Sequence, residues 1–420
     1  MIKKHISSLL VTAAISVTAG VQSASAEDLG ITAFYGDKLL DRVVVMDVDK
    51  MTLKTEIYTQ GIDPYPVDQA GALDKVYAIT RGSNSIDVID AKTLEPMGLI
   101  ELPHFPRSSE AYNATLGLQL VTGVDKPMAT LIDVNTDTAV ASVGLNQVFS
   151  VGDYGGSNAT GHPFWFNENQ FALIDRPNRT IHLYAVGKGK GKGKGKGKGK
   201  IHTRLLDSVP TPTAVHHFIK MTSGNAFYAL SEGSPSEGIS PSILKYVLQR
   251  GKLNFVAEVA LSDENIYEMG SHHADMHPDG IHMYIGSAEG NVYVLNTKTM
   301  KIITTIPAGL GAGHTTFVPE RNIAVVTNHK DTFVSIVDIL NHKLIKNVTV
   351  SGPSINGQIL QSHSTFIHPE MNLFYAFATD NGIFYELDLE TLEVSRTVET
   401  GGTPLQGVFM CQGDGCQNLM

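Results

Sequence analysis

A pattern of apolar runs and polar turns repeats along the chain. Each copy is a short apolar run that ends in Asp or Asn, with Thr, once Asn, three residues later. The copies lie around Asp49, Asp90, Asp133, Asn296, Asp338 and Asp388. The steps from Asp49 to Asp90, from Asp90 to Asp133 and from Asn296 to Asp338 are about 40–45 residues, the usual length of a propeller blade. Since Asp and Thr at such positions bond nearby backbone amides, each copy is interpreted as a structural hairpin turn.

Further strand-like runs precede the hairpins. They are rich in β-branched and aromatic residues and are separated by Gly, Asn and Asp, which is typical of strands joined by turns. These runs lie at 75–80, 116–123, 170–175, 226–233, 282–288, 322–328 and 373–380. Two more hairpins, at 181–206 and 242–261, continue the pattern where the Asp-x-x-Thr signature is weak. No amphipathic helical pattern competes with these runs, so the sequence predicts an all-β protein.

The strands group into complete units of four. Seven units are expected at about 62–102, 104–145, 155–206, 211–261, 270–308, 312–351 and 361–401. Three strands remain at the N-terminus, at 31–36, 43–48 and 54–59, and one remains at 404–410. Pairing them in one blade would close the ring and remove open sheet edges. The sequence therefore predicts an eight-bladed β-propeller, or a seven-bladed one if a hairpin within 150–260 is not a blade.

Two segments are set apart from the propeller. Residues 1–26 combine Lys3 and Lys4, an apolar stretch and a small-residue end, which is typical of a secretory signal peptide and too short for a membrane anchor. We therefore expect a single domain at 27–420 with export to the periplasm. Residues 187–200 are seven Gly-Lys pairs, interpreted as a flexible solvated loop, with polyanion binding as the alternative.

Charge and cysteine content narrow the possible partners. The formal net charge of −10 becomes −19 once Lys3, Lys4 and the seven lysines of the Gly-Lys run are set aside. Such an acidic body disfavours nucleic acid and favours metal cations or basic proteins. The two cysteines, Cys411 and Cys416, are expected to form a disulfide in an oxidising compartment, with a metal or redox pair as the alternative. No Cys-x-x-Cys-His sequence is present, which excludes covalent c-type haem.

Histidines recur in phase with the repeat, just before or within the inner strand of the units. They are His104, His162, His216–His217, His272–His273, His314 and His363. Inner strands line the channel of a propeller, so these side chains should converge at one channel mouth. Neighbouring residues of a strand point in opposite directions, so only one of each pair should face the axis unless the backbone kinks.

A set of imidazoles without thiolates suits copper or zinc better than calcium or magnesium. Extra or supporting ligands could come from Asp153, Asp275 and Glu370. The other histidines are interpreted as bonds between blades or as exposed residues: His182, His202, His282, His329, His342 and His368.

The order of apolar strand, Asp-x-x-Thr turn and inner strand resembles that of exported YVTN-type β-propellers over nearly the whole chain after the signal segment. The pair His216–His217, followed by Gly-His-Thr-Thr-Phe at His314, is similar to the propeller domain of nitrous oxide reductases. Thiocyanate dehydrogenases have a related arrangement. In those enzymes inner-strand histidines hold a multinuclear copper cluster. The resemblance implies cluster ligands at His162, His217, His273, His314 and His363, and with them His104, His216 and His272.

Three functions remain open at this point. The first is an exported copper-dependent oxidoreductase for a small inorganic or sulfur substrate, favoured by the number of histidines, since one bound ion takes only three or four ligands. The second is a non-catalytic metal binder that passes copper or zinc to a transporter or serves a redox partner. The third is a protein-interaction platform without metal. The cupredoxin-like second domain of nitrous oxide reductases has no counterpart in this sequence, which favours metal binding over catalysis.

Overall fold

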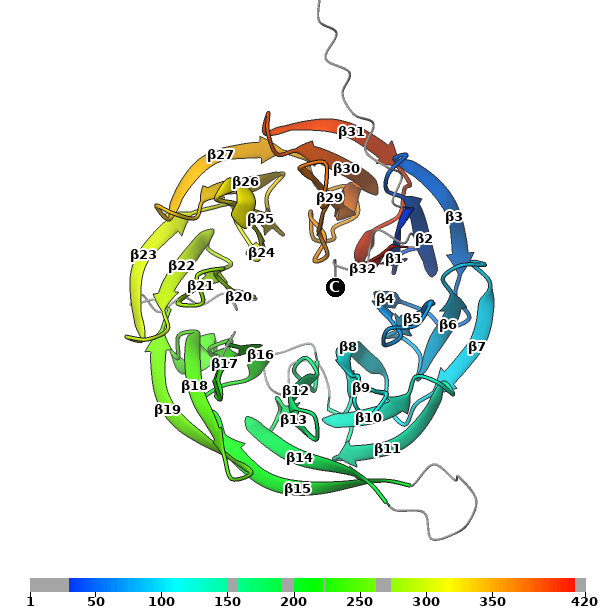
Figure 1. Cartoon of the computed structure of the whole chain (residues 1–420), viewed down its shortest axis with the longest axis vertical. Coiled ribbons are helices and arrows are strands. Elements are labelled where there is room, and N and C mark those ends of the chain that lie inside the picture. Colours follow the sequence, from blue (N-terminus) through cyan, green and yellow to red (C-terminus); the bar gives the residue numbers. More distant parts are fainter. Residues whose placement is uncertain (1–29, 150–157, 190–199, 222–223, 262–272, 412–420) are drawn as a thin grey trace, which may run out of the picture.

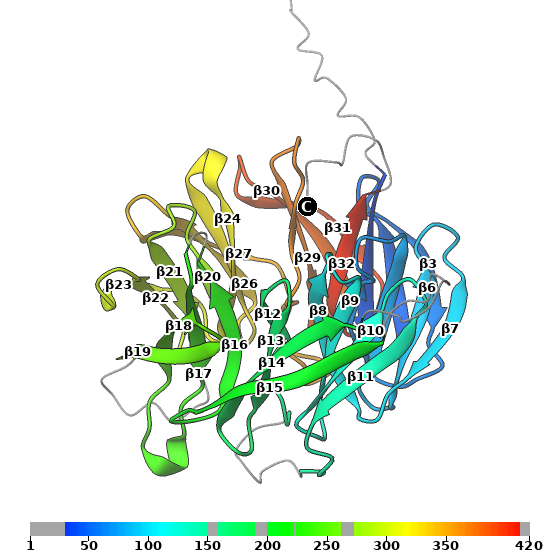
Figure 2. The ribbon, with the colours of Figure 1, turned by 60° about the horizontal axis from the view of Figure 1, so that its bottom comes forward.

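The computed structural model describes residues 30–149, 158–189, 200–221, 224–261 and 273–411. Eight four-stranded antiparallel sheets stand side by side in a ring around a central channel (Figure 1). The predicted all-β fold and the count of eight blades are confirmed. In the tilted view of Figure 2 the inner strands run along the channel, whereas the outer strands cross that direction, as the twist of each sheet requires.

We number the blades by their inner strands in chain order. Blade one holds β4 (Pro64–Gln69), β5 (Lys75–Thr80), β6 (Ser85–Asp90) and β7 (Pro96–Glu101). Blade two holds β8 (Pro106–Asn113), β9 (Leu118–Gly123), β10 (Met128–Asp133) and β11 (Thr138–Gly144). Blade three holds β12 (Phe164–Asn167), β13 (Gln170–Asp175), β14 (Thr180–Lys188) and β15 (Ile201–Pro210). Blade four holds β16 (Val215–Lys220), β17 (Ala226–Ser231), β18 (Ser242–Gln249) and β19 (Lys252–Ala260).

The second half of the ring repeats this arrangement. Blade five holds β20 (Ala274–Met276), β21 (His282–Gly286), β22 (Asn291–Asn296) and β23 (Lys301–Pro307). Blade six holds β24 (Ala312–Val318), β25 (Ile323–Asn328), β26 (Phe333–Asp338) and β27 (Lys343–Thr349). Blade seven holds β28 (Phe366–Ile367), β29 (Leu373–Ala378), β30 (Ile383–Asp388) and β31 (Glu393–Glu399). Short 3-10 turns are η1 (Pro235–Glu237), η2 (Pro319–Arg321) and η3 (Thr379–Asn381), and none of these described helices is long and apolar enough to cross a membrane.

The closing blade joins the two ends of the chain. Its strand order is β3 (Thr52–Tyr58), β2 (Arg42–Asp47), β1 (Ile31–Asp37) and β32 (Pro404–Cys411), with β32 innermost. The predicted closure by three N-terminal strands and one C-terminal strand is confirmed. Strand β1 pairs with β32 through most of its length, for example Tyr35 with Gly407.

The core lies between neighbouring blades. Residues of β26 in blade six, such as Val334 and Ile336, belong to the same buried cluster as Phe374 and Tyr385 of blade seven. The two middle strands of a blade are covered on both faces, which explains their continuous apolar runs, while outer strands such as β23 alternate between exposed and at least partly buried residues.

The repeated Asp turns are structural, as predicted. The Asp90 carboxylate accepts the backbone N–H groups of Lys92 and Thr93 at 2.9 and 2.8 Å. In the closing blade this position belongs to Asp47, which accepts the N–H of Lys50 at 3.0 Å, and not to Asp49. The sequence assignment there was wrong by two residues because Asp47 and Asp49 both follow the same apolar run.

Two predicted features lie partly or wholly outside the described residues. These are the signal segment 1–26 and the part of the Gly-Lys run at 190–199. Gly187 and Lys188 continue β14 and pair with His202 and Ile201, so the connection after β14 begins later than the sequence suggested.

Candidate metal centre

Seven imidazoles from five consecutive blades surround one side of the channel. We call this group the histidine belt; it consists of His162, His216, His217, His273, His314, His329 and His363. Neighbouring rings are in contact along the whole belt. Ring centroids are 4.9 Å apart for His162 and His216, 5.2 Å for His217 and His273, and 3.4 Å for His273 and His314. The predicted convergence of inner-strand histidines is therefore present in the fold.

A β-bulge places both His216 and His217 in the belt. In β16 the pairing with β17 is regular at Val215 and again at Phe218, with a register shift between them. A bulge bends the strand and re-aims side chains, which permits two adjacent residues to reach the same side. The two rings lie 5.5 Å apart, and each also lies within 5.5 Å of His273. This is the backbone kink that the sequence left open.

One group of candidate ligands within the belt is His314, His329 and His363. One nitrogen of each ring lies within 4.8 Å of the others. Nitrogens that share a tetrahedral zinc ion at about 2.0–2.1 Å are roughly 3.4 Å apart. Small side-chain rotations would bring these three rings onto one ion, so this donor set fits a metal.

His329 was interpreted from the sequence as an interblade or exposed residue. It does bond the Gln361 carbonyl at the entry to blade seven, but its ring also lies in the belt, which the sequence analysis did not predict. His329 follows the second strand of blade six instead of opening its inner strand. Because the strands are antiparallel, the end of β25 at Asn328 pairs with the start of β24 at Ala312. The residue after each second strand therefore lies at the same channel mouth as the residues that open the inner strand. The antiparallel hairpins predicted from the sequence already imply this position.

Carboxylates and a carbonyl orient several rings of the belt. Glu110 bonds Nδ1 of His162 at 2.5 Å, and Glu232 bonds Nδ1 of His216 at 2.7 Å. Nδ1 of His329 is 3.0 Å from the backbone oxygen of Gln361. Such contacts select the ring tautomer and leave the opposite nitrogen for a metal, which is the usual arrangement around bound ions.

The remaining predicted ligands do not join the belt. His104 is buried in blade two, where Nε2 is 3.0 Å from the Thr130 hydroxyl, and burial lowers its pKa to about 4. Glu370 donates its backbone N–H to His368 at a turn. His272, Asp153 and Cys416 lie outside the described residues, and the disulfide from Cys411 stays a prediction.

Of the three predicted extra ligands, Asp275 is the one that the structure places beside the belt. It shares a hollow of about 550 Å³ with His217, His273 and His314, and Glu110 lines the same hollow. Burial raises the Asp275 pKa to about 7, although the N–H of Thr315 donates to it at 2.8 Å.

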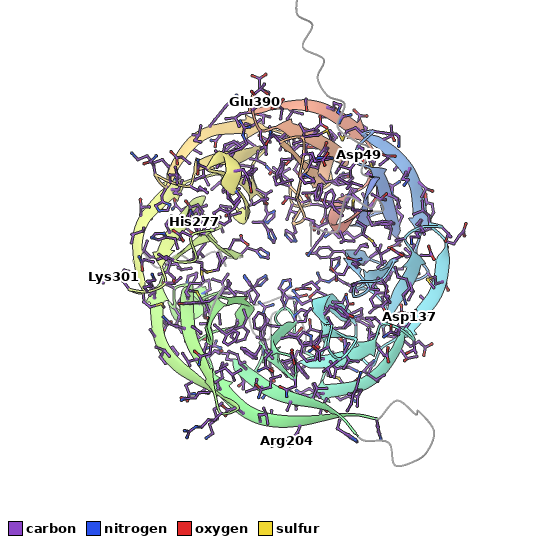
Figure 3. The ribbon with its side chains drawn as sticks, viewed as in Figure 1. Asp49, Asp137, Arg204, His277, Lys301 and Glu390 are labelled. Atoms are coloured by element: carbon purple, nitrogen blue, oxygen red, sulfur yellow. The ribbon has the colours of Figure 1, made fainter. Side chains whose placement is uncertain are left out.

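A second group of possible ligands, His277, Asp279 and His282, lies between blades five and six (Figure 3). The hydrogen bonds of His277 indicate a structural role for this group. Nδ1 of His277 accepts the N–H of Asp279 at 3.1 Å, and Nε2 bonds the Ile339 carbonyl of the next blade at 3.2 Å. His368 repeats this arrangement: Nδ1 accepts the N–H of Glu370, and Nε2 lies 3.3 Å from Asp49. In His277 and His368, therefore, Nδ1 bonds within the residue's own turn and Nε2 joins the blade to the next one.

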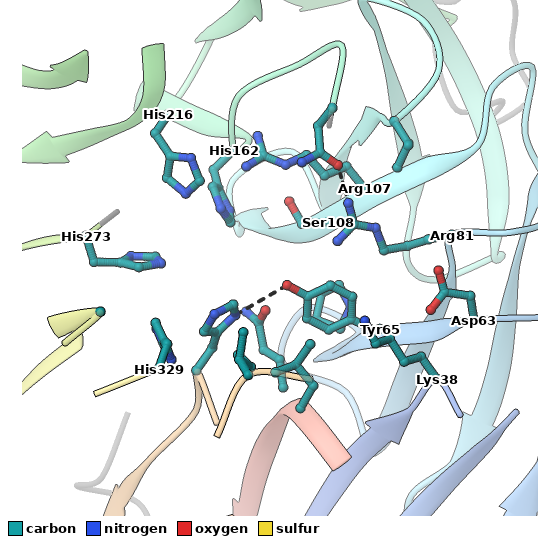
Figure 4. A pocket seen from close by; sticks show the side chains of 18 of the residues that line it. Lys38, Asp63, Tyr65, Arg81, Arg107, Ser108, His162, His216, His273 and His329 are labelled. Carbon is teal, nitrogen blue, oxygen red and sulfur yellow. Dashed lines mark hydrogen bonds between the residues drawn. The ribbon is translucent and has the colours of Figure 1, made fainter. Parts of the chain in front are cut away.

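On its other side the belt borders a cavity of about 600 Å³. Figure 4 shows His162, His216, His273 and His329 on one side of this cavity and Lys38, Arg81 and Asp63 across from them. Tyr65 reaches over the cavity, with its hydroxyl 3.3 Å from Nδ1 of His363. The metal candidates thus stand at the wall of a space large enough for a small molecule.

The fold and these side chains define an eight-bladed β-propeller with a channel lined by histidines of five blades.

No known family model matches the sequence, and no curated protein matches it. Among solved structures the chain is similar to the dihydro-heme d1 dehydrogenase NirN in complex with DHE, at 12% identity and a TM-score of 0.63 over 92% of this chain and 76% of that one. Apo AztD from Citrobacter koseri matches at 12% identity and a TM-score of 0.57 over 91% and 99%. Sqt1 from Saccharomyces cerevisiae matches at 9% identity and a TM-score of 0.62 over 88% of each chain. At these identities the similarity shows the propeller fold.

Proposed function

We propose that this protein is an exported metal-binding propeller that holds copper or zinc at the histidine belt. The observation that carries the proposal is the convergence of His314, His329 and His363, with ring nitrogens within 4.8 Å of one another. Imidazole nitrogens without thiolates favour copper and zinc over harder ions. The signal-like segment 1–26 supports a periplasmic location, where the bound ion would pass to a metal transporter or a redox partner protein.

Some residues of the belt would bind the ion, and others would orient the ligands. His314, His329 and His363 would bind the first ion, and His273, whose ring lies 3.4 Å from that of His314, would complete or bridge the site. When bound, copper would supply one-electron chemistry, and zinc would supply Lewis acidity alone. Glu110 and Glu232 would hold the imidazoles of His162 and His216 in a ligating orientation.

A copper-dependent oxidoreductase acting on a small inorganic or sulfur compound is the second candidate. Seven described imidazoles exceed the four ligands of one tetrahedral ion. This surplus, next to a cavity of about 600 Å³, favours a site with more than one ion and room for a substrate.

Metal analysis of the purified chain tests the proposal. His329→Ala should abolish binding of the first ion or weaken it by about 100-fold or more, since loss of a direct ligand exceeds the 10–100-fold effect of an outer contact. Because His329 is buried and bonds the Gln361 carbonyl, its variant should also lose about 1–3 kcal/mol of stability, so metal content and not stability is the readout. His104→Ala is the matched control: metal content should stay unchanged while stability falls, because His104 is a buried residue that bonds Thr130 within blade two.

The stoichiometry separates the candidates. One labile ion per chain supports a carrier, and two or more ions lost together in His314→Ala and in His273→Ala support a cluster. Unchanged metal content in His329→Ala, His314→Ala and His273→Ala would refute the belt as a metal site and favour the protein-interaction platform.

A further inference from the structure

The cavity beside the histidine belt carries an excess of positive charge. Two residues that follow the second strands of their blades line it with cationic side chains: Lys38 in the closing blade and Arg81 in blade one. Arg107 adds a further guanidinium from the inner strand β8. The only carboxylate that the described cavity-lining residues add is Asp63.

Arg107 is the most unusual of these groups. It is 4% exposed and lines the cavity, and it occupies a break in the pairing of β8 with β9, between Pro106 and Ser108. One of its NH groups donates to the backbone oxygen of Thr160. Among the described residues no carboxylate lies within ion-pair distance of Arg107. A buried guanidinium in this state is costly, because its charge is removed from water without a partner.

Its surroundings make the charge less favourable still. Burial, followed by the nearby guanidinium groups of Arg176 and Arg81, lowers the pKa of Arg107 to about 9. The carboxylates of Glu232 and Glu110 oppose this lowering of the pKa, but each already has other partners: Glu232 binds Arg176 and Nδ1 of His216, and Glu110 bonds Nδ1 of His162. Arg81 donates to the side chain of Asn158 and stacks over Tyr65, with its guanidinium carbon 4.8 Å from the ring centre.

We propose that the cavity is a binding site for a small oxyanion, a carboxylate or a sulfur or phosphorus oxyanion, held by Arg107, Arg81 and Lys38. Guanidinium forks match planar and tetrahedral oxyanions through paired, charge-assisted hydrogen bonds. A ligand in this position would also touch His162, His273 and His363, which line the same cavity. It would therefore meet a metal on the belt, and only this last step rests on the proposed function.

Calorimetry on chelator-treated, metal-free protein at low ionic strength tests the anion site independently of the metal. Sulfate and acetate are the probes, and at least one of them should bind one site per chain with a Kd at or below about 1 mM. Arg107→Met should weaken that binding about tenfold or more, the loss expected for a charge-assisted contact. Arg179→Met is the control, since Arg179 forms an exposed pair with Glu237 away from the cavity.

The thermal midpoint provides a second readout. Because Arg107→Met removes an uncompensated buried charge, the midpoint should stay the same or rise, whereas a purely structural arginine would lower it. If Arg107→Met does not fold, Lys38→Met is tested in its place. This partly exposed lysine can be replaced without disturbing the core, and the affinity for sulfate or acetate should fall about two- to fivefold.

Three results would overturn the proposal. They are the absence of saturable sulfate or acetate binding to the wild type, equal affinity in Arg107→Met and Arg179→Met, and unchanged affinity in Lys38→Met where Arg107→Met is unfolded. Loss of metal binding in His329→Ala with anion affinity retained would leave the anion site standing. Failure of the two proposals is thereby distinguishable.

Discussion

Asp68→Asn should stabilise the protein at alkaline pH and have a smaller effect in acid. Asp68 lies in β4, and one of its oxygens accepts the N–H and hydroxyl of Ser109 at 3.0 and 2.8 Å. Burial, helped by the neighbouring Glu110 carboxylate, raises its pKa to about 7. The ordinary value in an unfolded chain is about 3.9.

The sign follows from proton binding. Between about pH 4 and pH 7 the folded state keeps a proton on Asp68 that the unfolded state has lost, so stability falls as the pH rises through this window. Below pH 4 both states are protonated and the penalty vanishes. Three pKa units correspond to about 4 kcal/mol at most, and we expect about 2–4 kcal/mol at pH 8. Asparagine keeps an oxygen for Ser109 and carries no charge, so it removes this penalty.

Urea unfolding at pH 4, 5.5 and 8, followed by the fluorescence of Trp165, measures the effect. The quantity of interest is the change with pH of the stability difference between Asp68→Asn and the wild type. Asp90→Asn is the control of opposite sign: backbone N–H groups of Thr93 and Lys92 lower the Asp90 pKa, so its contribution is lost as the pH falls. A stability difference for Asp68→Asn that does not change with pH would refute the reasoning.

Three shorter predictions concern the scaffold. Replacing 190–199 by a short Gly-Ser turn, with the paired residues 187–189 and 200 kept, should leave the thermal midpoint nearly unchanged, since alternating Gly and Lys has no apolar face to pack; a large fall would mean that this part of the run packs on the blades. His104→Ala should cost about 1–3 kcal/mol in urea unfolding, because it removes a buried ring and its bond to Thr130; no loss would contradict a structural role for His104 in blade two. Gly407→Ala should destabilise the closing blade by about 1–3 kcal/mol, since a Cβ there would lie 1.9 Å from the Phe34 backbone oxygen; an unchanged urea midpoint would show that β32 shifts freely.

The sequence alone determined the architecture. Repeats of about 40–45 residues set the number of blades, because each blade is one unit of four short strands that must bury its faces against the next. The leftover strands at 31–59 and 404–410 predicted the closure, since an unpaired sheet edge is unfavourable. Local turn chemistry at Asp90 and its counterparts was also readable, because it depends only on residues three positions apart.

The tertiary structure decided which side chains meet. His104 and His314 look alike in the sequence, yet one bonds Thr130 inside its own blade and the other joins the belt. His216 and His217 both reach the belt only because a bulge interrupts β16. The place of His329 after a second strand could have been read from the predicted hairpin, but its contact with His314 and His363 could not. Arg107 gave no signal, because it sits in a break of an inner strand. Their positions depend on pairing register and on the curvature of the ring, which bring together residues more than 200 positions apart, and no local pattern encodes those distances.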